Sequence, residues 1–374
     1  MPVTYRPACE VAILGAGPAG TACAIALARA GVGPVCLIDA ARPDSVAIGE
    51  TIPPDARLLL GRLGLLPAFL EQGHAPCLGS CSAWGNDTLG HNDFLLNPQG
   101  TGWHLDRAGF DAFLRGHAVE SGAYLSKGAR LADAAADGEE GHRLLLNDGR
   151  AMSARFVVDA TGRASAFARR MGARQVPLDR LTFVYGFFDT AGAVSRSQLT
   201  LLEAVENGWW YAAGLPGGRL AVAFATDPER VTADGLSRDE GWLPAALATR
   251  HLAERLEGSR FLPGSRIARV APSFLLDKVA GPRWLAIGDA AACFDPLAAQ
   301  GIYKALEDGL EAARLIATAL DRGGELGGSH AEAMRARFDD YLINRNYFYG
   351  LERRWPDSDF WRKRQQRTAF ASAA

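Results

Sequence analysis

The start of the chain alternates between short apolar runs and a small-residue helical pattern. Residues 10–14 (EVAIL) read as a buried strand, and residues 21–30 (TACAIALARA) form an alanine-rich helical run that stops at Gly31. Residues 34–39 (PVCLID) read as a second strand, because continuous apolar runs of this length are typical of parallel sheets buried on both faces. The pattern therefore predicts one β-α-β unit.

A glycine-rich turn, residues 15–20 (GAGPAG), joins this first strand to the helix. The first glycine permits the tight turn, the second lets the backbone approach a pyrophosphate, and the third lets helix and strand pack closely. The helix N-terminus would face the phosphates, and Asp39 can accept a hydrogen bond from a ribose hydroxyl. A glycine-rich turn in another kind of α/β protein is the alternative. We favour a dinucleotide site, whose candidate residues are Gly15, Gly17, Pro18, Ala19, Gly20, Asp39 and Ala40.

Further along the chain, the spacing of the apolar residues is first typical of helices and then of strands. Residues 57–70 (RLLLGRLGLLPAFL) read as an amphipathic helix, and Asp106 as the N-cap of another helix. Strand-like runs separated by turns such as LPGGR fill residues 175–275 and predict an inserted antiparallel sheet. The α/β pattern resumes at residues 283–289, and helical patterns follow.

Composition and charge narrow the possible partners. The 374 residues are 48% hydrophobic and 22% charged, with a net charge of -2, which argues against a disordered, collagen-like or coiled-coil protein. Such a chain has no bulk positive field for nucleic acid or an anionic membrane, and residues 9–15 do not read as a signal peptide. The six cysteines are scattered without histidine partners at zinc-ligand spacing. We therefore expect a cytoplasmic protein with no metal site and no nucleic-acid or membrane partner.

Three segments in order resemble the FAD-dependent monooxygenase and tryptophan-halogenase-like flavoprotein superfamily. They are GAGPAG (15–20), DATG (159–162) and IGDAAACFDPLAAQGI (287–302). The segments GETIPP, HLDRAGFDAFL, GWW and LPGGR resemble, more narrowly, the LodB-like branch, whose members are implicated in maturing tryptophylquinone cofactors. The resemblance implies an α/β fold in three parts. These are a glutathione-reductase-type FAD-binding Rossmann domain (1–174 and 276–322), an inserted antiparallel β-sheet substrate domain (175–275) and C-terminal helices (323–374).

The same motifs imply further contacts with FAD. Asp289 ends a strand beside small residues, where its carboxylate can accept a hydrogen bond from a ribityl hydroxyl. Backbone N–H groups of the segment Pro296 to Ile302, apart from proline itself, would face the flavin edge that becomes anionic on reduction. By resemblance Arg107 reaches the flavin or its diphosphate, and a surface arginine at a helix start is an equally good interpretation. The candidates from these motifs are Gly49, Glu50, Thr51, Arg107, Ala160, Gly162, Gly288, Asp289, Pro296, Gly301 and Ile302.

The chain departs from flavin halogenases where their chemistry resides. By resemblance, Cys77 replaces the lysine that converts hypohalous acid, and Ala298 replaces the glutamate after DPL. We therefore expect an FAD-dependent monooxygenase acting on an aromatic or indole group. That group would be an aromatic small molecule or, as the LodB-like resemblance implies, a tryptophan of a partner protein during quinone-cofactor maturation. A halogenase, a flavin-dependent reductase and a non-catalytic FAD-binding maturation partner remain as alternatives.

Electron and proton carriers are less defined. The sequence has no second GxGxxG motif for a dedicated NAD(P)H domain, so NADH or NADPH could reduce the flavin directly or through a partner flavin reductase. No catalytic residue is assigned. His104 could carry a proton because its reference pKa is about 6.5, but a packed histidine is the favoured interpretation. Trp209, Trp210 and Tyr211 alternate across the inserted sheet, so we expect one face to be buried against the core.

Overall fold

The computed structural model describes residues 8–40, 50–137, 141–194, 197–322 and 327–366. Its first layer is built on a parallel sheet, whose strands are β1 (Ala8–Leu14), β2 (Val35–Asp39), β8 (Tyr124–Lys127), β11 (Ala151–Asp159) and β19 (Trp284–Ala286). The order across the sheet is β19-β11-β1-β2-β8, and each neighbouring pair runs parallel. The predicted β-α-β unit is confirmed, because α1 (Pro18–Arg29) joins β1 to β2.

The parallel pairing brings the carboxyl ends of four strands to one edge of this sheet. Leu14, at the end of β1, pairs with Ile38 on one side and with Asp159 on the other. Asp159 in turn pairs with Ala286, the last residue of β19. The turns that follow these strands therefore lie together, at the position where open α/β sheets bind their ligands.

Helices cover one face of the parallel sheet. Helices α1, α4 (Arg107–Glu120) and α9 (Gly301–Arg322) share a hydrophobic core with β1 and β11. Small residues let α1 and α9 pack very closely, since a Cβ on Gly309 would lie 2.6 Å from the carbonyl oxygen of Ala19. The opposite face packs against α5 (Ala166–Arg170), α10 (Gly327–Leu351) and the antiparallel strands β9 (Leu131–Ala136) and β10 (His142–Leu146). The short strand β18 (Ala280–Gly281) pairs antiparallel with β19 at the edge of the sheet.

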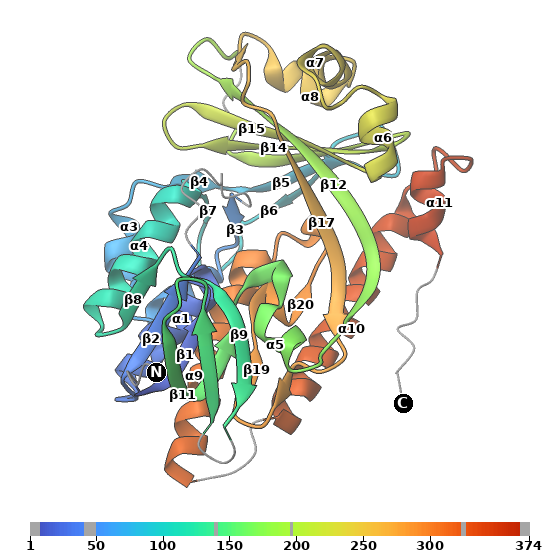
Figure 1. Cartoon of the computed structure of the whole chain (residues 1–374). Coiled ribbons are helices and arrows are strands. Elements are labelled where there is room, and N and C mark those ends of the chain that lie inside the picture. Colours follow the sequence, from blue (N-terminus) through green and yellow to red (C-terminus); the bar gives the residue numbers. More distant parts are fainter. Residues whose placement is uncertain (1–7, 41–49, 138–140, 195–196, 323–326, 367–374) are drawn as a thin grey trace.

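A second sheet lies above the first in Figure 1, and the long strands β12 (Gln175–Asp189) and β17 (Ile267–Leu276) run from one to the other. Its order is β20-β17-β12-β15-β14-β13-β5-β6, antiparallel except where β13 pairs parallel with β5. The predicted antiparallel sheet is thus present, and segments outside 175–275 extend it at both ends. The remaining strands are β5 (Gly79–Ala83), β6 (Gly90–Asp93), β13 (Leu199–Val205), β14 (Gly208–Leu215), β15 (Arg219–Thr226), β16 (Arg260–Phe261) and β20 (Ala292–Cys293).

The two faces of the second sheet meet different helices. Trp210 stacks on Phe224 at 4.6 Å between ring centroids and meets Trp242 of α7 (Asp239–Leu247) at 5.3 Å. Trp209 points the other way and contacts Tyr349 of α10. The predicted alternation along this strand is therefore confirmed, with both faces buried. Helix α8 (His251–Leu256) lies beside α7, α6 (Pro228–Ala233) packs against β12, and α11 (Asp359–Gln365) lies beside α10.

One predicted helix is wrong. The segment predicted as one helix over residues 57–70 contains two short helices instead, α2 (Ala56–Arg62) and α3 (Leu66–Leu70). Gly64 takes a φ of 73° between them, a conformation that ends a helix at little cost only for glycine. Nearby, β3 (Thr51–Ile52), β4 (Ala75–Cys77) and β7 (Gly102–His104) form a small sheet. Within the described ranges, no helix is long and apolar enough to cross a membrane.

Candidate functional site

The glycine turn after β1 is held by close backbone contacts. A Cβ on Gly15 would lie 2.2 Å from the carbonyl oxygen of Ala160, and one on Gly20 would lie 1.9 Å from the carbonyl oxygen of Gly15. Gly15 also has a φ of 107°. Both positions therefore require glycine for the fold itself, which agrees with the roles of the first and third glycines in the sequence motif.

Gly17 differs from its two neighbours in the motif. A Cβ there would have nothing within 4 Å among the described residues, so the fold leaves open space in front of it. Gly17 is the N-cap of α1, and no side chain in the described part of the chain caps this helix end by a hydrogen bond. Open space beside free helical N–H groups suits a pyrophosphate. The turn therefore fits a dinucleotide, with Pro18 and Ala19 opening the helix.

A second turn, after β11, packs against the first. Asp159 is buried, and its carboxylate accepts hydrogen bonds from Thr161, Phe167 and Ala168. Burial raises the pKa of Asp159, while these hydrogen bonds oppose the rise. The aspartate thus fixes the turn, and the turn presents Ala160 and Gly162 at the carboxyl edge of the sheet. Gly162 has a φ of 62°, with nothing described within 4 Å of its Cβ position.

The ribose side of the predicted site is only partly described. Asp39 ends β2 at the same edge, is partly exposed, and its side chain is thus open to a ligand. Ala40 follows it and is exposed. Gly49 lies outside the described residues.

A third turn follows β19. Gly288 has a φ of 60°, and its N–H donates a 2.8 Å hydrogen bond to Asp308 of α9. Asp308 is buried and pairs with Arg337 of α10. Asp289 comes next, with 39% of its side chain exposed, and lies 3.4 Å from the Lys304 ammonium. Gly288 and Asp289 are candidates from the sequence, whereas Lys304 and Asp308 are not, because charged residues four apart on a helix usually indicate a solvent-exposed face.

The loop before α9 is fixed by a buried carboxylate. Asp295 accepts a 2.9 Å hydrogen bond from the N–H of Leu297 and a 2.7 Å hydrogen bond from the Tyr349 hydroxyl. This loop carries Pro296 in a 3-10 turn (Pro296–Ala298), and α9 then begins at Gly301. Burial raises the pKa of Asp295, which Arg345 and the hydrogen bonds oppose. Ile302, in the first turn of α9, is buried in the core against α1.

Polar side chains link the small sheet to the second sheet. Buried Glu50 accepts a 3.3 Å hydrogen bond from the Tyr211 hydroxyl. The Thr51 hydroxyl lies 3.1 Å from that of Tyr211 and 3.1 Å from Nδ1 of His104. Burial, with the charge of Glu50 second, raises the pKa of Tyr211 well above its usual value. The network therefore holds a protonated tyrosine against a carboxylate, at the face of β14 that also bears Trp209.

His104 lies at the inner end of this network. Its Nε2 lies 3.4 Å from the carbonyl oxygen of Gln198, and only 1% of the residue is exposed. Burial lowers its pKa to about 4. The histidine is therefore neutral near pH 7, which favours a packed histidine over a proton carrier.

Arg107 is not a surface side chain. It starts α4, keeps 12% of its side chain exposed, and pairs with Asp111 at 3.3 Å. Burial first and Glu50 second raise the pKa of Tyr185, whereas the charges of Arg163 and Arg107 lower it. Arg163 directly follows the turn after β11.

Cys77 and Ala298 are the residues that, by resemblance, we expect at the positions of the halogenase lysine and glutamate. Cys77 is fully buried, and its thiol donates to the carbonyl oxygen of Gly79 at 3.4 Å. Burial raises its pKa, so the thiol stays protonated. Ala298 lies in the 3-10 turn after Asp295.

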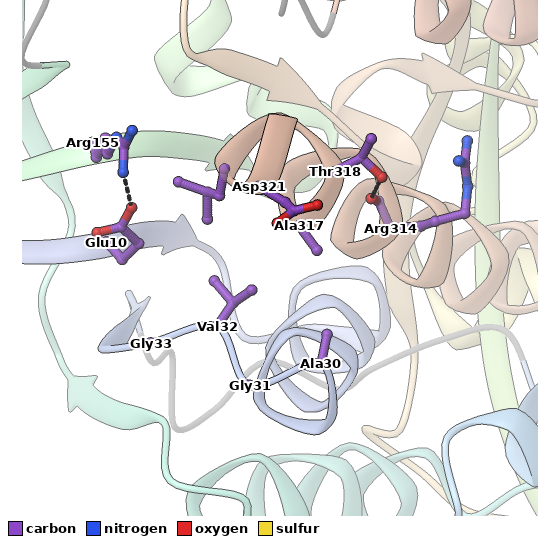
Figure 2. A pocket seen from close by; sticks show the side chains of 11 residues that line it. Glu10, Ala30, Gly31, Val32, Gly33, Arg155, Arg314, Ala317, Thr318 and Asp321 are labelled. Carbon is purple, nitrogen blue, oxygen red and sulfur yellow. Dashed lines mark hydrogen bonds and ion pairs between the residues drawn. The ribbon is translucent and has the colours of Figure 1, made fainter. Parts of the chain in front are cut away.

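A shallow depression of about 720 Å³ lies at the opposite end of the parallel strands (Figure 2). Glu10, near the start of β1, and Arg155, in the middle of β11, form a 2.8 Å ion pair there, and residues 30–33 and the end of α9 complete the lining. Since the three turns follow the carboxyl ends of the strands, this depression is separate from them.

Comparison with known proteins agrees with this arrangement of turns. The sequence profile of the family described as "FAD binding domain" matches residues 8–343. LodB of Marinomonas mediterranea, a predicted FAD-dependent oxidoreductase, is 27% identical over 377 residues, covering 98% of this chain and 99% of LodB.

Two solved structures are also similar. CmlS, a flavin-dependent halogenase, superposes with a TM-score of 0.85 at 22% identity, covering 98% of this chain and 68% of CmlS. QhpG, a peptidyl tryptophan dihydroxylase essential for tryptophylquinone cofactor biogenesis, superposes with a TM-score of 0.70 at 26% identity, covering 96% of this chain and 79% of QhpG. The likeness to CmlS confirms the predicted fold class.

Proposed function

The chain belongs to the FAD-binding-domain family of oxidoreductases and monooxygenases, and from that premise we propose that it hydroxylates an aromatic, indole-like group. The group is a tryptophan side chain of a partner polypeptide, which the hydroxylation prepares for conversion to a quinone cofactor.

The likeness to QhpG is the observation that carries this proposal. QhpG acts on a tryptophan within a peptide, and it is 26% identical to this chain over nearly the whole chain. The likeness to the halogenase CmlS is 22%, which supports the fold alone. The buried thiol of Cys77 argues in the same direction, because a protonated thiol cannot replace the ammonium that converts hypohalous acid.

We propose that the three turns at the carboxyl edge hold FAD. The open space before Gly17 receives the pyrophosphate, Asp39 the ribose, and Asp289 a ribityl hydroxyl. FAD supplies the oxygen activation when it is bound and reduced. The remaining proposed contacts are Gly15, Pro18, Ala19, Gly20, Ala40, Gly49, Glu50, Thr51, Arg107, Ala160, Gly162, Gly288, Pro296, Gly301 and Ile302.

The chain's own groups manage the substrate and its proton in this proposal. Replacing an aromatic C–H bond by C–O releases the ring proton, and a nearby base must accept it. Glu50 is our candidate base, and the Tyr211 hydroxyl orients its carboxylate from 3.3 Å. The apolar face around Trp209, with Phe183 at 5.3 Å between ring centroids, excludes water from the reacting pair.

Co-expression with a tryptophan-bearing partner polypeptide tests this function. The cells are grown under dioxygen labelled with a heavy oxygen isotope, and the partner polypeptide is then isolated and digested. Its tryptophan-containing peptides should have gained heavy oxygen atoms. Gly17→Glu, which places a carboxylate in the phosphate space, should abolish the gain, and Gly116→Glu on the exposed side of α4 should keep it. An unmodified partner beside an FAD-loaded chain would contradict the proposal and favour a non-catalytic maturation partner.

The remaining alternatives give different outcomes in related experiments. Halide incorporation in place of oxygen would indicate a halogenase. Turnover under strict anaerobiosis would indicate a reductase, and oxygenation of a free aromatic molecule but not of the polypeptide would change the substrate class. We propose NADH or NADPH as the electron source. Bleaching of the flavin by either nucleotide alone would indicate direct reduction, and bleaching only by dithionite would indicate a partner flavin reductase.

A further inference from the structure

Lys304 is a buried cation beside the carboxyl edge. It lies in the first turns of α9, and only 2% of its side chain is exposed. Its ammonium donates a hydrogen bond to the carbonyl oxygen of Ala292, lies 3.4 Å from Oδ1 of Asp289, and lies 4.6 Å from the ring centroid of Phe294. All three partners belong to the segment that follows β19.

A lysine at this position needs an explanation beyond packing. Burying an ammonium is costly unless it is paired and hydrogen-bonded, and an apolar residue of similar volume is often the more stable choice. The partner, Asp289, is much less buried than the lysine, since 39% of its side chain is exposed. The pair is therefore one-sided, with the cation inside the protein and the carboxylate facing the edge where the three turns meet.

The charge of Asp289 alone would oppose the cofactor. FAD carries a pyrophosphate, and its ring becomes anionic on reduction, so an uncompensated carboxylate nearby would disfavour both the binding and the reduction of the flavin. We infer that Lys304 is a positioning residue: it fixes the Asp289 carboxylate so that it can accept a hydrogen bond from the cofactor, and it cancels the carboxylate's charge toward the flavin. This inference concerns FAD binding and does not depend on the identity of the substrate.

The test compares Lys304→Met, Asp289→Asn and the double variant in the full chain. FAD is titrated into each FAD-free protein, and the midpoint potential of the bound flavin is measured. Lys304→Met leaves an uncompensated carboxylate, so we expect the Kd for FAD to rise about tenfold or more and the potential to fall. Asp289→Asn leaves an uncompensated cation, so the potential should rise. The double variant should return toward the native potential.

Opposite shifts in potential separate a charge effect from simple loosening of the site, which would move both single variants in the same direction. Lys304→Arg should keep the potential close to native, and Lys278→Met, which removes an exposed lysine, should change neither the Kd nor the potential. An unchanged Kd and potential in Lys304→Met, or shifts of the same sign in both single variants, would overturn the inference. If Lys304→Met does not fold, Lys304→Gln is compared with Asp289→Asn by the same two measurements.

Discussion

The hydroxyl of Tyr349 donates a 2.7 Å hydrogen bond to Oδ2 of Asp295, although the two residues lie 54 positions apart. The same hydroxyl accepts a 3.2 Å hydrogen bond from the indole N–H of Trp209. One side chain of α10 therefore connects the loop before α9 to β14 of the second sheet. The C-terminal helices therefore contribute to the structural support of the candidate site.

We expect Tyr349→Phe to destabilise the protein. The change leaves a buried carboxylate oxygen and a buried indole N–H without the hydroxyl that both now use, so the free energy of unfolding should fall by about 2–4 kcal/mol. Urea denaturation followed by circular dichroism measures the change. Tyr347→Phe is the control, because Tyr347 lies on the same helix and is 61% exposed. Equal stabilities for the two variants would show that the two hydrogen bonds of the Tyr349 hydroxyl contribute little to the free energy of unfolding.

Gly17 and Gly20 of the first turn should respond differently to alanine. At Gly20 a Cβ would overlap the carbonyl of Gly15, so Gly20→Ala should destabilise the FAD-free protein by about 1–3 kcal/mol. At Gly17 the fold has room, so Gly17→Ala should change stability by less than about 1 kcal/mol while raising the Kd for FAD about tenfold or more.

Thermal unfolding of the FAD-free chain and titration with FAD check the two effects separately. Gly116→Ala, at an open position in α4, should stabilise the helix by about 0.5–1 kcal/mol and leave the Kd unchanged. Native FAD affinity in Gly17→Ala would mean that the pyrophosphate does not use this space.

His104 should make the protein less stable in mild acid. Its pKa is about 4 in the folded state and about 6.5 in the unfolded state, so the unfolded chain takes up the proton first as the pH falls. Stability is therefore lost between pH ~6.5 and pH ~4, by about 3 kcal/mol in total from this residue. Urea denaturation at several pH values should show a smaller slope for His104→Gln than for the native chain. His91→Gln, at an exposed histidine of β6, should keep the native slope, and an identical slope for His104→Gln would contradict the assignment.

The parts of the site that the sequence predicted are local in the chain. The turn at residues 15–20 and Asp289 each follow a strand that can be predicted from its own apolar run. Parallel pairing of these strands then brings the turn and Asp289 to the same edge of the sheet. The antiparallel sheet could also be predicted, because its strands too have recognisable local patterns separated by turns. The helix over residues 57–70 was wrong because its apolar spacing continues through Gly64, whose φ of 73° ends the first helix.

The parts that the sequence did not predict depend on distant contacts. Lys304 has the pattern of an exposed helical residue, and only packing against the segment after β19 buries it. Helix α10 likewise buries His330, Arg345 and Tyr349 together with its apolar residues, so it has no simple apolar stripe. A hydrophobic pattern cannot reveal a face on which charged groups are paired across the fold.

Arg364 of α11 illustrates such pairing at the end of the described chain. Its side chain is 1% exposed, and it contacts two carboxylates, at 2.9 Å to Asp179 and at 2.7 Å to Asp227. Arg345 of α10 also pairs with Asp179, at 2.5 Å. The cluster thereby fastens both C-terminal helices to the second sheet and to the start of α6.

We expect Arg364→Met to be strongly destabilising, because it leaves buried carboxylates with one cation fewer. Removing one partner of a buried ion pair typically costs about 3–5 kcal/mol, and the loss should also weaken the contact between Tyr349 and the loop before α9. Arg362→Met is the matched control, since Arg362 lies two residues earlier on the same helix and is 58% exposed. Chemical denaturation should therefore show a large loss for Arg364→Met and at most about 1 kcal/mol for Arg362→Met. Similar small losses in both would mean that α11 is held by its apolar residues alone, with Phe360 and Trp361 as its main contacts.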